Sequence, residues 1–518
     1  MHSGGTPTYQ NWQNNTDPCW WRDRGLRVNT LYCVILFLGL ATSGYDGSYL
    51  SGLQALATWR KYFGHPDSKT LGLLTASAYF PTLLAPIPLS WICDRYGRRP
   101  AILIGASFIV AGAIVGGLSQ SLGMLIGGRI IVGFGNVFLL VSTLCLCNEL
   151  THPRLRSVTT AFVHTVYYVG SIIAALLTFG FGFKDNSSLG NWVWRVPALF
   201  QAFTPIILII CTLLFLPESP RYLISRGRNQ EALELVARLH ANGKLDDELV
   251  VNSIHEMTTA IALEQQSKGT TWRSMLATKG NRRRLLVITV IASATQWLGQ
   301  GILSYYIAPV LKTVGLTTTR SVTGFNLGLS VWNWFCASLG ASLVDRVGRR
   351  PLWIYGTFAF FVSYTCFMIC SALYAERHDK HAANAAMFFI FTIYAAYNMS
   401  YNPLSYSYVV EILPFSLRSK GVAYFNVIQT LAVITNQYVN PIALAKIHWK
   451  YYGVYVAISF AYGIAAIFLY PETKGLTAEE VGALFDKGTE TDNLAIITAN
   501  RDDLVKRSKE EVEEIEKI

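Results

Sequence analysis

Two loops in this sequence carry closely spaced carboxylate and guanidinium groups. Residues 94–99 read Asp-Arg-Tyr-Gly-Arg-Arg, and residues 345–350 repeat the pattern as Asp-Arg-Val-Gly-Arg-Arg. Glu149 precedes Arg156 with the same spacing that separates Glu411 from Arg418. Such groups pair with one another and with the negative ends of helices, so we predict two clusters that tie helix ends together. The members are Asp94, Arg95, Arg98, Glu149, Arg156, Asp345, Arg346, Arg349, Glu411 and Arg418.

One carboxylate lies inside a long apolar run. Asp46 belongs to the first such run, and Arg129 lies near the start of the fourth. A carboxylate within a membrane helix costs on the order of 3 kcal/mol and is a candidate for function. Because the first and fourth helices run in opposite directions, the two side chains are predicted to meet at similar depth. A pair that loosens when Asp46 is protonated is a proton-coupling switch. The alternative is that Asp46 only caps its helix at the outer interface.

Uncharged polar side chains also interrupt the apolar runs. Amides hydrogen-bond to hydroxyl groups, and aromatic faces pack on the C–H surfaces of sugars. Full charges are few in these runs, so the pattern predicts a neutral, polyhydroxylated ligand. The alternative is hydrogen bonding between helices, worth only about 0.6 kcal/mol per bond, or a buried core role for the histidine. The candidate ligand-binding residues are His164, Gln296, Tyr305, Asn333, Asn402, Tyr406, Gln429 and Asn436.

The composition identifies the class of protein. Of the 518 residues, 52% are hydrophobic and only 14% are charged, against about 25% charged in soluble proteins. The net charge of +11 is interpreted as cytoplasmic Lys and Arg that orient membrane helices, and no partner nucleic acid is expected. No phosphate-binding loop, nucleophile elbow or metal-ligand spacing occurs. We therefore expect neither an enzyme nor a metal or organic cofactor; the coupling ion is the proton.

About twelve runs are long enough to cross a membrane, since each crossing needs about 20 mainly apolar residues. The predicted fold is an all-α membrane protein with two pseudo-symmetric six-helix halves. Repeats of this kind are typical of alternating-access transporters. The predicted segments are an N-terminal tail (1–27), a first half (28–216), a linker with amphipathic helices (217–284), a second half (285–470) and a C-terminal tail (471–518).

Charge sets the predicted orientation. The arginine-rich loops follow even-numbered helices, so they lie on one side, which is cytoplasmic by the positive-inside bias. The charged clusters are therefore predicted to form a cytoplasmic gate, which holds when a transporter faces outward and breaks when its site opens inward; a plain anchoring role is the alternative. Both tails are then cytoplasmic. No cleavable signal peptide is evident, so the first helix is expected to direct membrane insertion. Asn186, in the sequon Asn186-Ser187-Ser188 of a predicted outer loop, is a candidate glycosylation site.

From about residue 28 to about residue 475 the chain resembles a sugar porter of the major facilitator superfamily. The matching stretches are Gly128-Arg129 with Gly133 and Gly135, both charged loops, Pro217-Glu218-Ser219-Pro220-Arg221, and Pro471-Glu472-Thr473-Lys474-Gly475. Residues 44–53 and 436–441 are similar to the fungal lactose permease and cellodextrin branch. The resemblance implies rocker-switch sugar transport. In the family's proton symporters an aspartate of helix one pairs with an arginine of helix four, which fits Asp46 and Arg129.

The sequence departs from the family's sugar-binding pattern. In helix seven, Gln296, Gly299, Tyr305 and Tyr306 match, but Thr295 replaces a glutamine and Gly301 an asparagine. His164 stands where the family has glutamine, Tyr406 where many members have tryptophan, and Asn402 where they have glycine. Asn333 and Gln429 match family sugar ligands. These departures remove amides that contact hexoses, so the resemblance favours a disaccharide such as lactose or cellobiose first and a hexose second.

We therefore expect a plasma-membrane sugar/proton symporter that functions as a monomer in the lipid bilayer. A carrier of a polyol or secondary metabolite is the second interpretation. A non-transporting sugar sensor is the third. Sensors of this family have long cytoplasmic tails, whereas few residues follow Gly475, which favours transport.

Overall fold

The computed structural model describes residues 12–183, 189–267, 272–474, 476 and 478–485. The described part is built from helices, because long apolar runs in a membrane must satisfy their backbone groups internally. The N-terminal half consists of α1 (Arg24–Ala55), α3 (Ser68–Ala76), α4 (Pro81–Leu84), α5 (Pro86–Tyr96), α6 (Arg98–Gly117), α7 (Leu122–Leu150), α8 (Arg156–Gly182), α9 (Trp192–Phe200) and α10 (Phe203–Leu214).

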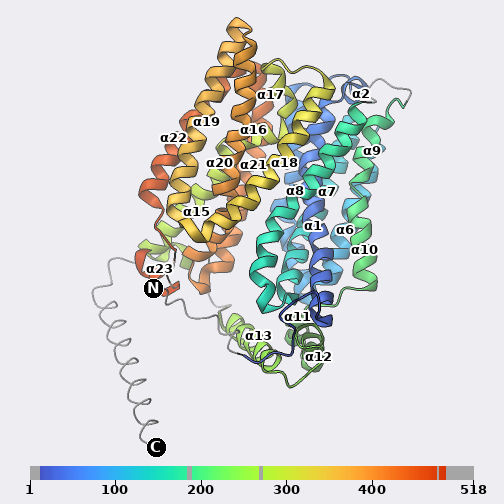
Figure 1. Ribbon diagram of the computed structural model, residues 1–518, viewed down its shortest axis with the longest axis vertical. Coiled ribbons are helices and arrows are strands. Elements are labelled where there is room, and N and C mark those ends of the chain that lie inside the picture. Colours follow the sequence, from blue (N-terminus) through green and yellow to red (C-terminus); the bar gives the residue numbers. More distant parts are fainter. Residues whose placement is uncertain (1–11, 184–188, 268–271, 475, 477, 486–518) are drawn as a thin grey trace, which may run out of the picture.

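The C-terminal half stands beside it in Figure 1. It consists of α15 (Lys279–Trp297), α16 (Gln300–Tyr305), α17 (Ile307–Thr313), α18 (Thr319–Val347), α19 (Arg349–Arg377), α20 (Lys380–Ile412), α21 (Phe415–Ile447) and α22 (Tyr452–Leu469). Shorter helices join or flank the halves. They are α2 (Ala57–Tyr62), α11 (Pro220–Ser225), α12 (Asn229–His240), α13 (Glu248–Ser267), α14 (Ser274–Ala277) and α23 (Ala478–Phe485).

By length and composition, nine helices within the described residues can cross a membrane, or ten when the bent α3–α5 pair is taken as one span. One of these runs, Leu417–Leu469, contains both α21 and α22. The 29-residue α18, in which the side chains of residues 344 and 345 lie outside the described part, is not among the nine. The prediction of twelve spans is consistent with this arrangement, although only nine or ten spans among the described residues meet the requirements of length and composition.

Several spans are broken where the sequence requires it. The second span bends by 47° between α4 and α5, where Pro81 and Pro86 each begin a new helix because proline cannot donate to the preceding turn. Gly299 separates α15 from α16 with a φ of +107°, a backbone conformation that favours glycine. After the break at Gly299, α16 carries Gln300, Ser304 and Tyr305, which line the central cavity.

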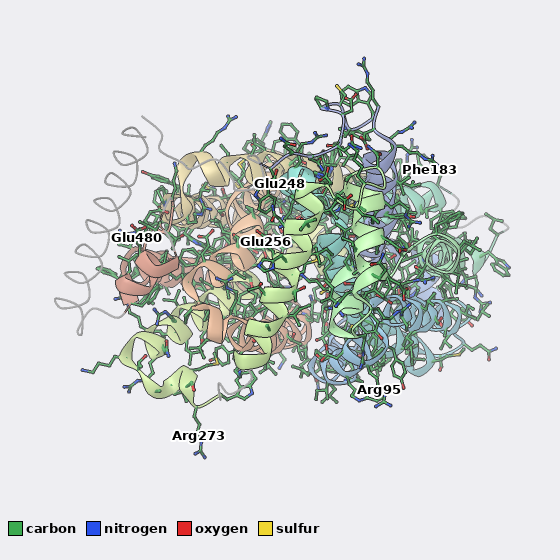
Figure 2. All side chains as sticks on the ribbon, turned by 90° about the horizontal axis from the view of Figure 1, so that it is seen from below. Arg95, Phe183, Glu248, Glu256, Arg273 and Glu480 are labelled. Atoms are coloured by element: carbon green, nitrogen blue, oxygen red, sulfur yellow. The ribbon has the colours of Figure 1, made fainter. Side chains whose placement is uncertain are left out.

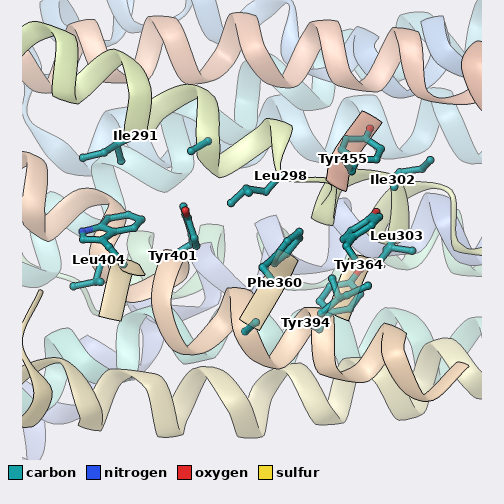
Figure 3. Close-up of a cluster of buried hydrophobic side chains, with 14 of the residues drawn as sticks. Ile291, Leu298, Ile302, Leu303, Phe360, Tyr364, Tyr394, Tyr401, Leu404 and Tyr455 are labelled. Atoms are coloured by element: carbon teal, nitrogen blue, oxygen red, sulfur yellow. The ribbon is translucent and has the colours of Figure 1, made fainter. Parts of the chain in front are cut away.

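Small residues let helices of the N-terminal half approach closely. A Cβ atom at Gly44 of α1 would collide with the carbonyl of Tyr167 in α8, and one at Gly170 of α8 would collide with the carbonyl of Ala41. Association of helices in a bilayer depends on this close packing. In the C-terminal half an aromatic cluster fills the interior instead, including Phe360, Tyr364 and Tyr401 (Figure 3).

The linker helices gather at one end of the bundle. Figure 1 shows α11, α12 and α13 at the same end as the start of α1 and α23. Both α11 and α12 pack against the N-terminal half. Residues 12–23 cross this region as an extended segment, which we call the strap. Seen from below, the linker helices lie over the bundle (Figure 2).

Candidate functional site

A buried ion pair lies in the N-terminal half. Arg129 of α7 donates to the Asp46 carboxylate of α1. Asp46 is 6% exposed and Arg129 is 3% exposed. Charges so far from water are tolerated only when they are paired and hydrogen-bonded. The ion pair lies beside the cavity between the halves, because Gly47, Ser48 and Ser51 of α1 line that cavity.

Gln201 is a third member of this site that the sequence patterns did not indicate. Its Nε2 donates to Asp46 Oδ1 over 2.7 Å. The residue sits at the break between α9 and α10, where no periodic pattern marks its direction. The guanidinium of Arg129 also lies 5.5 Å from the ring centroid of Tyr49, a cation–π contact. The carboxylate is therefore held by a charge and an amide together.

A polar cavity lies between the two halves. Its free volume is about 70 Å³, well below the ~300–1,000 Å³ of occupied small-molecule sites, so it is contracted in this conformation. The lining side chains are hydroxyls, phenols and amides with one leucine, and none of those the structure describes is charged. They are Ser48, Ser51, Tyr167, Tyr168, Ser171, Gln300, Ser304, Tyr305, Asn326, Leu329, Ser330, Asn333 and Tyr394, with Gly47.

Hydrogen bonds cross between the halves around this cavity. The Tyr79 hydroxyl lies 2.7 Å from that of Tyr305, and Ser171 Oγ donates to Ser330 Oγ over 3.4 Å. At the end of the bundle opposite the linker helices, α3 packs against α21, and α1 against α17. The cavity is therefore closed at that end.

A second group of cross-half bonds is centred on Tyr168. Its hydroxyl donates to Asn398 Oδ1 over 2.6 Å and accepts from Asn402 Nδ2 over 3.3 Å. Asn398 in turn donates to Asn333 Oδ1 over 3.0 Å. Tyr168 and Asn398 were not singled out from the sequence. The polar side chains of Tyr167, Tyr168 and Ser171, close together on one helix, could have indicated that Tyr168 belongs to the site.

The predicted ligand residues separate into two groups. Tyr305 and Asn333 line the cavity, and Asn402 joins the Tyr168 group. Gln296 is half-buried, and among the described residues its side-chain amide has no hydrogen-bond partner. His164 lies on α8 one turn before Tyr168, and its side chain lies outside the part that the structure describes.

The other three predicted ligands are engaged within the C-terminal half. Tyr406 donates to Gln429 Oε1 over 3.1 Å, and Gln429 Nε2 donates to Thr295 Oγ1 over 3.2 Å. Asn436 donates to the Gln296 carbonyl over 2.7 Å and accepts from the Tyr455 hydroxyl over 3.2 Å. Asn436 is 5% exposed and does not line the cavity in this conformation.

Each charged loop forms an ion pair inside its own half. Arg98 Nη2 lies 3.1 Å from Glu149 Oε1, which joins α6 to α7. Arg349 Nη2 lies 3.1 Å from Glu411 Oε1, which joins α19 to α20. In this conformation the two pairs therefore brace the helix ends within each half.

A glutamate from the next motif completes each loop. Glu218 accepts from the first two backbone N–H groups of α6 over 2.9 and 3.2 Å, and Glu472 does the same for α19 over 3.0 Å. A carboxylate at a helix N-terminus satisfies free donors and complements the dipole. Gly97 and Gly348, at φ +99° and +108°, adopt the turn that brings the glutamate close to the N-terminus of the helix. The Pro-Glu motif, which occurs twice in the sequence, could have indicated the role of these two glutamates.

The remaining predicted loop residues have different surroundings. The Arg95 guanidinium lies 5.8 Å from the ring centroids of both Trp91 and Tyr96, and Arg226 Nη2 donates to the Asp94 carbonyl over 2.8 Å. The Arg346 carbonyl accepts from Lys474 Nζ. Arg156 begins α8 and Arg418 lies in the first turn of α21. The Asp345 side chain and the glycosylation candidate Asn186 lie outside the described residues.

Two helical halves around an uncharged polar cavity, with a buried ion pair beside it, define a multi-pass membrane transporter rather than an enzyme. Comparison with known families agrees. Residues 32–485 match the family described as "Sugar (and other) transporter". The chain belongs to this family, the sugar porters of the major facilitator superfamily, as the sequence resemblance indicated.

Similar proteins cover most of the chain. It is 28% identical to MFS-type transporter oryC of Aspergillus oryzae, over 92% of this chain and 88% of that protein. It is 25% identical to a high-affinity glucose transporter of Kluyveromyces lactis, over 85% and 82%. The inward-open xylose transporter XylE of E. coli has the same fold, with a TM-score of 0.74 at 19% identity over 88% of this chain and 99% of that one.

Proposed function

We propose that this chain carries a neutral sugar across the plasma membrane by alternating access. The observation that carries the proposal is the uncharged lining of the cavity between the halves. Hydroxyls and amides exchange hydrogen bonds with sugar hydroxyls, and four tyrosine rings supply flat apolar faces. A charged solute would instead need a compensating charge at this site.

Proton coupling is the second part of the proposal, with the proton as coupling ion. Protonation of Asp46 removes the charge that Arg129 and Gln201 hold. Loss of that charge frees α1 and α7 to separate, and the adjacent cavity-lining residues Ser48 and Ser51 are on the same helix α1. The proton:xylose symporter XylE, bound to 6-bromo-6-deoxy-D-glucose, shares the fold with a TM-score of 0.70 at 21% identity.

We place a disaccharide ahead of a hexose as the substrate. Thr295 and Gly301 lack the amides that the family presents in helix seven. At Gly301 a Cβ atom would collide with the Asn436 amide, so Asn436 occupies the space that an asparagine side chain would need. Among the described residues the Gln296 side-chain amide has no hydrogen-bond partner, so it is available to a sugar hydroxyl.

The orientation follows from the position of the charged loops. The arginine-rich loops, the linker helices and the start of α1 share one end of the bundle (Figure 1), which we assign to the cytoplasm by the positive-inside bias. All the proposed sites are formed by a single chain, which supports a functional monomer. The five segments predicted from the sequence remain part of this proposal.

Uptake of labelled lactose, cellobiose and glucose tests the function. The chain is produced in yeast stripped of its own sugar carriers, and external pH is recorded as each sugar is added. We expect uptake of a disaccharide with alkalinisation of the medium. Uptake of glucose alone would overturn the disaccharide assignment. No uptake by protein that reaches the plasma membrane would overturn sugar transport in favour of a polyol or metabolite carrier, or a sensor.

A further inference from the structure

The start of α1 presents an exposed surface of two tryptophans and three arginines. Trp20 and Trp21 are 40% and 57% exposed, and their rings stand edge to face with centroids 5.9 Å apart. Arg22, Arg24 and Arg27 are all exposed. We call these five residues the basic aromatic surface. Seen from below, the N-terminal segment reaches beyond the outline of the helices (Figure 2).

The arginines of this surface lack an acidic partner among the described residues. The first turn of α1 contains no acidic residue, so its cations oppose the positive end of the helix dipole. Two carboxylates lie nearby. Asp17 is exposed and accepts from Cys19 N over 2.7 Å, and Asp23 is 5% exposed and is occupied elsewhere. It accepts from Leu26 N over 2.9 Å, from Asn242 Nδ2 over 2.7 Å and from Asp17 N over 3.1 Å.

We propose that the basic aromatic surface binds anionic phospholipids of the cytoplasmic leaflet. Guanidinium groups bind phosphate oxygens with two parallel hydrogen bonds. Tryptophan rings settle at the level of the lipid headgroups. The surface lies where a membrane helix begins, so both groups meet the headgroup layer together. The assignment of the leaflet rests on the proposed orientation, while the binding itself does not require transport.

The same segment is tied to the linker helices. In the strap, Asn14 Nδ2 donates to the His240 carbonyl over 2.8 Å, and Asn15 N donates to Asp247 Oδ2 over 2.7 Å. Asn242, between α12 and α13, donates to the Asn15 carbonyl over 2.9 Å. A lipid that fixes the basic aromatic surface therefore also fixes the strap over α12 and α13.

The rival explanation is that these arginines only orient the first helix during insertion. An insertion signal needs no ligand once the protein has folded, whereas a lipid site binds at equilibrium. The thermal unfolding midpoint of purified full-length protein, in neutral detergent with added phosphatidylserine or phosphatidylcholine, separates the two. A ligand that binds only the folded state raises this midpoint. We expect phosphatidylserine, and not phosphatidylcholine, to raise it.

The triple variant Arg22→Gln, Arg24→Gln, Arg27→Gln should need on the order of 100-fold more phosphatidylserine, at about fivefold per arginine. Its midpoint without lipid should equal that of the unmodified protein, which verifies folding. Three lysines at these positions keep the charge and should retain most of the affinity. The matched control, which removes the same charge from the exposed residues of the linker region, should respond as the unmodified protein does. It is Arg221→Gln, Arg238→Gln, Lys244→Gln.

Three outcomes would overturn the proposal. The first is an unchanged phosphatidylserine response in the arginine-to-glutamine variant. The second is an equal loss of response in the linker control, since that would mean binding by net charge alone. The third is the same stabilisation by inorganic phosphate, which would make the surface a site for the free ion.

Discussion

At the scale of single residues, Asp46 places an ionised carboxylate within a membrane helix, where a charge is costly in free energy. The carboxylate is held by Arg129 and by the Gln201 amide, and no sequence pattern indicated the amide. An amide donates to the ionised carboxylate without adding a second negative charge, so Gln201 favours the paired form. Protonation of Asp46 weakens both contacts at once, because a neutral acid accepts weaker hydrogen bonds.

Asp46→Asn should abolish uphill accumulation of the sugar while leaving exchange across the membrane in place. The asparagine keeps the size of the side chain but carries no titratable charge. Accumulation and exchange of labelled sugar in yeast vesicles measure the two activities separately. Asp67→Asn, which alters an exposed N-cap of α3, should accumulate sugar normally. Accumulation retained by Asp46→Asn would exclude this residue from coupling.

Two histidines whose rings meet edge to face make the junction of α12 sensitive to acid. Burial lowers the pKa of His152 to about 3 and that of His240 to about 4, and the rings lie 4.9 Å apart. Both are therefore neutral in the docked state, while undocked rings titrate near pH 6.5. The undocked state then binds more protons below about pH 6.5, so docking weakens as pH falls from there toward about 4, by on the order of 1 kcal/mol per pH unit for each ring.

Hydrogen exchange of the α12 amides, followed from about pH 7 to about pH 5 and corrected for intrinsic rates, measures this loss. Protection should fall more steeply in the unmodified protein than in His240→Gln, whose amide still donates to the Leu150 carbonyl in place of the ring. His255→Gln removes an exposed ring of α13 and should leave the steep profile unchanged. A steep profile in His240→Gln would assign the acid sensitivity to other groups.

At the scale of elements, one buried carboxylate accepts two of the hydrogen bonds that hold the strap. Asp247 is 8% exposed and accepts from Asn14 Nδ2, from Asn15 N and from Leu249 N, over 3.2, 2.7 and 3.1 Å. Further bonds join the strap to His240, Ala241 and Asn242. The carboxylate therefore contributes to how firmly the strap covers α12 and α13.

Asp247→Ala should release the strap without unfolding the bundle. Three donors lose their acceptor, at about 1–3 kcal/mol for each group left unsatisfied away from water. Limited proteolysis should then cut the segment before α1 faster, and the rate of cleavage at residues 12–22 is the measurement. Asp246→Ala removes the exposed neighbouring carboxylate and should be cut at the original rate. Equal rates for both variants would show that Asp247 does not hold the strap.

At the scale of the whole molecule, the repeated charged motifs predicted two related halves, and the family match and the fold confirm this prediction. The repeat reports on sequence-local features, namely tight glycine turns and charged loops between helices. Contacts between segments that are far apart in the chain leave no such pattern in the sequence. Gln201 at a helix break, the Tyr168–Asn398 bond across the halves and the inward position of Asn436 depend on how helices bend and pack, which apolar periodicity does not encode.

The two halves meet at their outer ends through a glycine, and this contact decides which side of the cavity is closed. Gly72 of α3 faces α21, where an added Cβ atom would lie 2.8 Å from the Tyr438 carbonyl and 3.2 Å from Pro441 Cγ. Backbone groups cannot yield as a flexible side chain does. A large residue at this position must therefore push α3 and α21 apart and favour a conformation that is open to the outside.

Gly72→Trp should consequently stop net transport while leaving sugar binding from the outside intact. Overpacking costs about 1–3 kcal/mol, which shifts the equilibrium against the outer-closed state by roughly 5- to 150-fold. Uptake and equilibrium binding of the transported sugar, in right-side-out vesicles with matched protein levels, separate the two effects. Gly127→Trp on α7 adds the same bulk where the surroundings are open and should transport normally. Normal uptake by Gly72→Trp would mean that the α3–α21 contact does not form the outer closure.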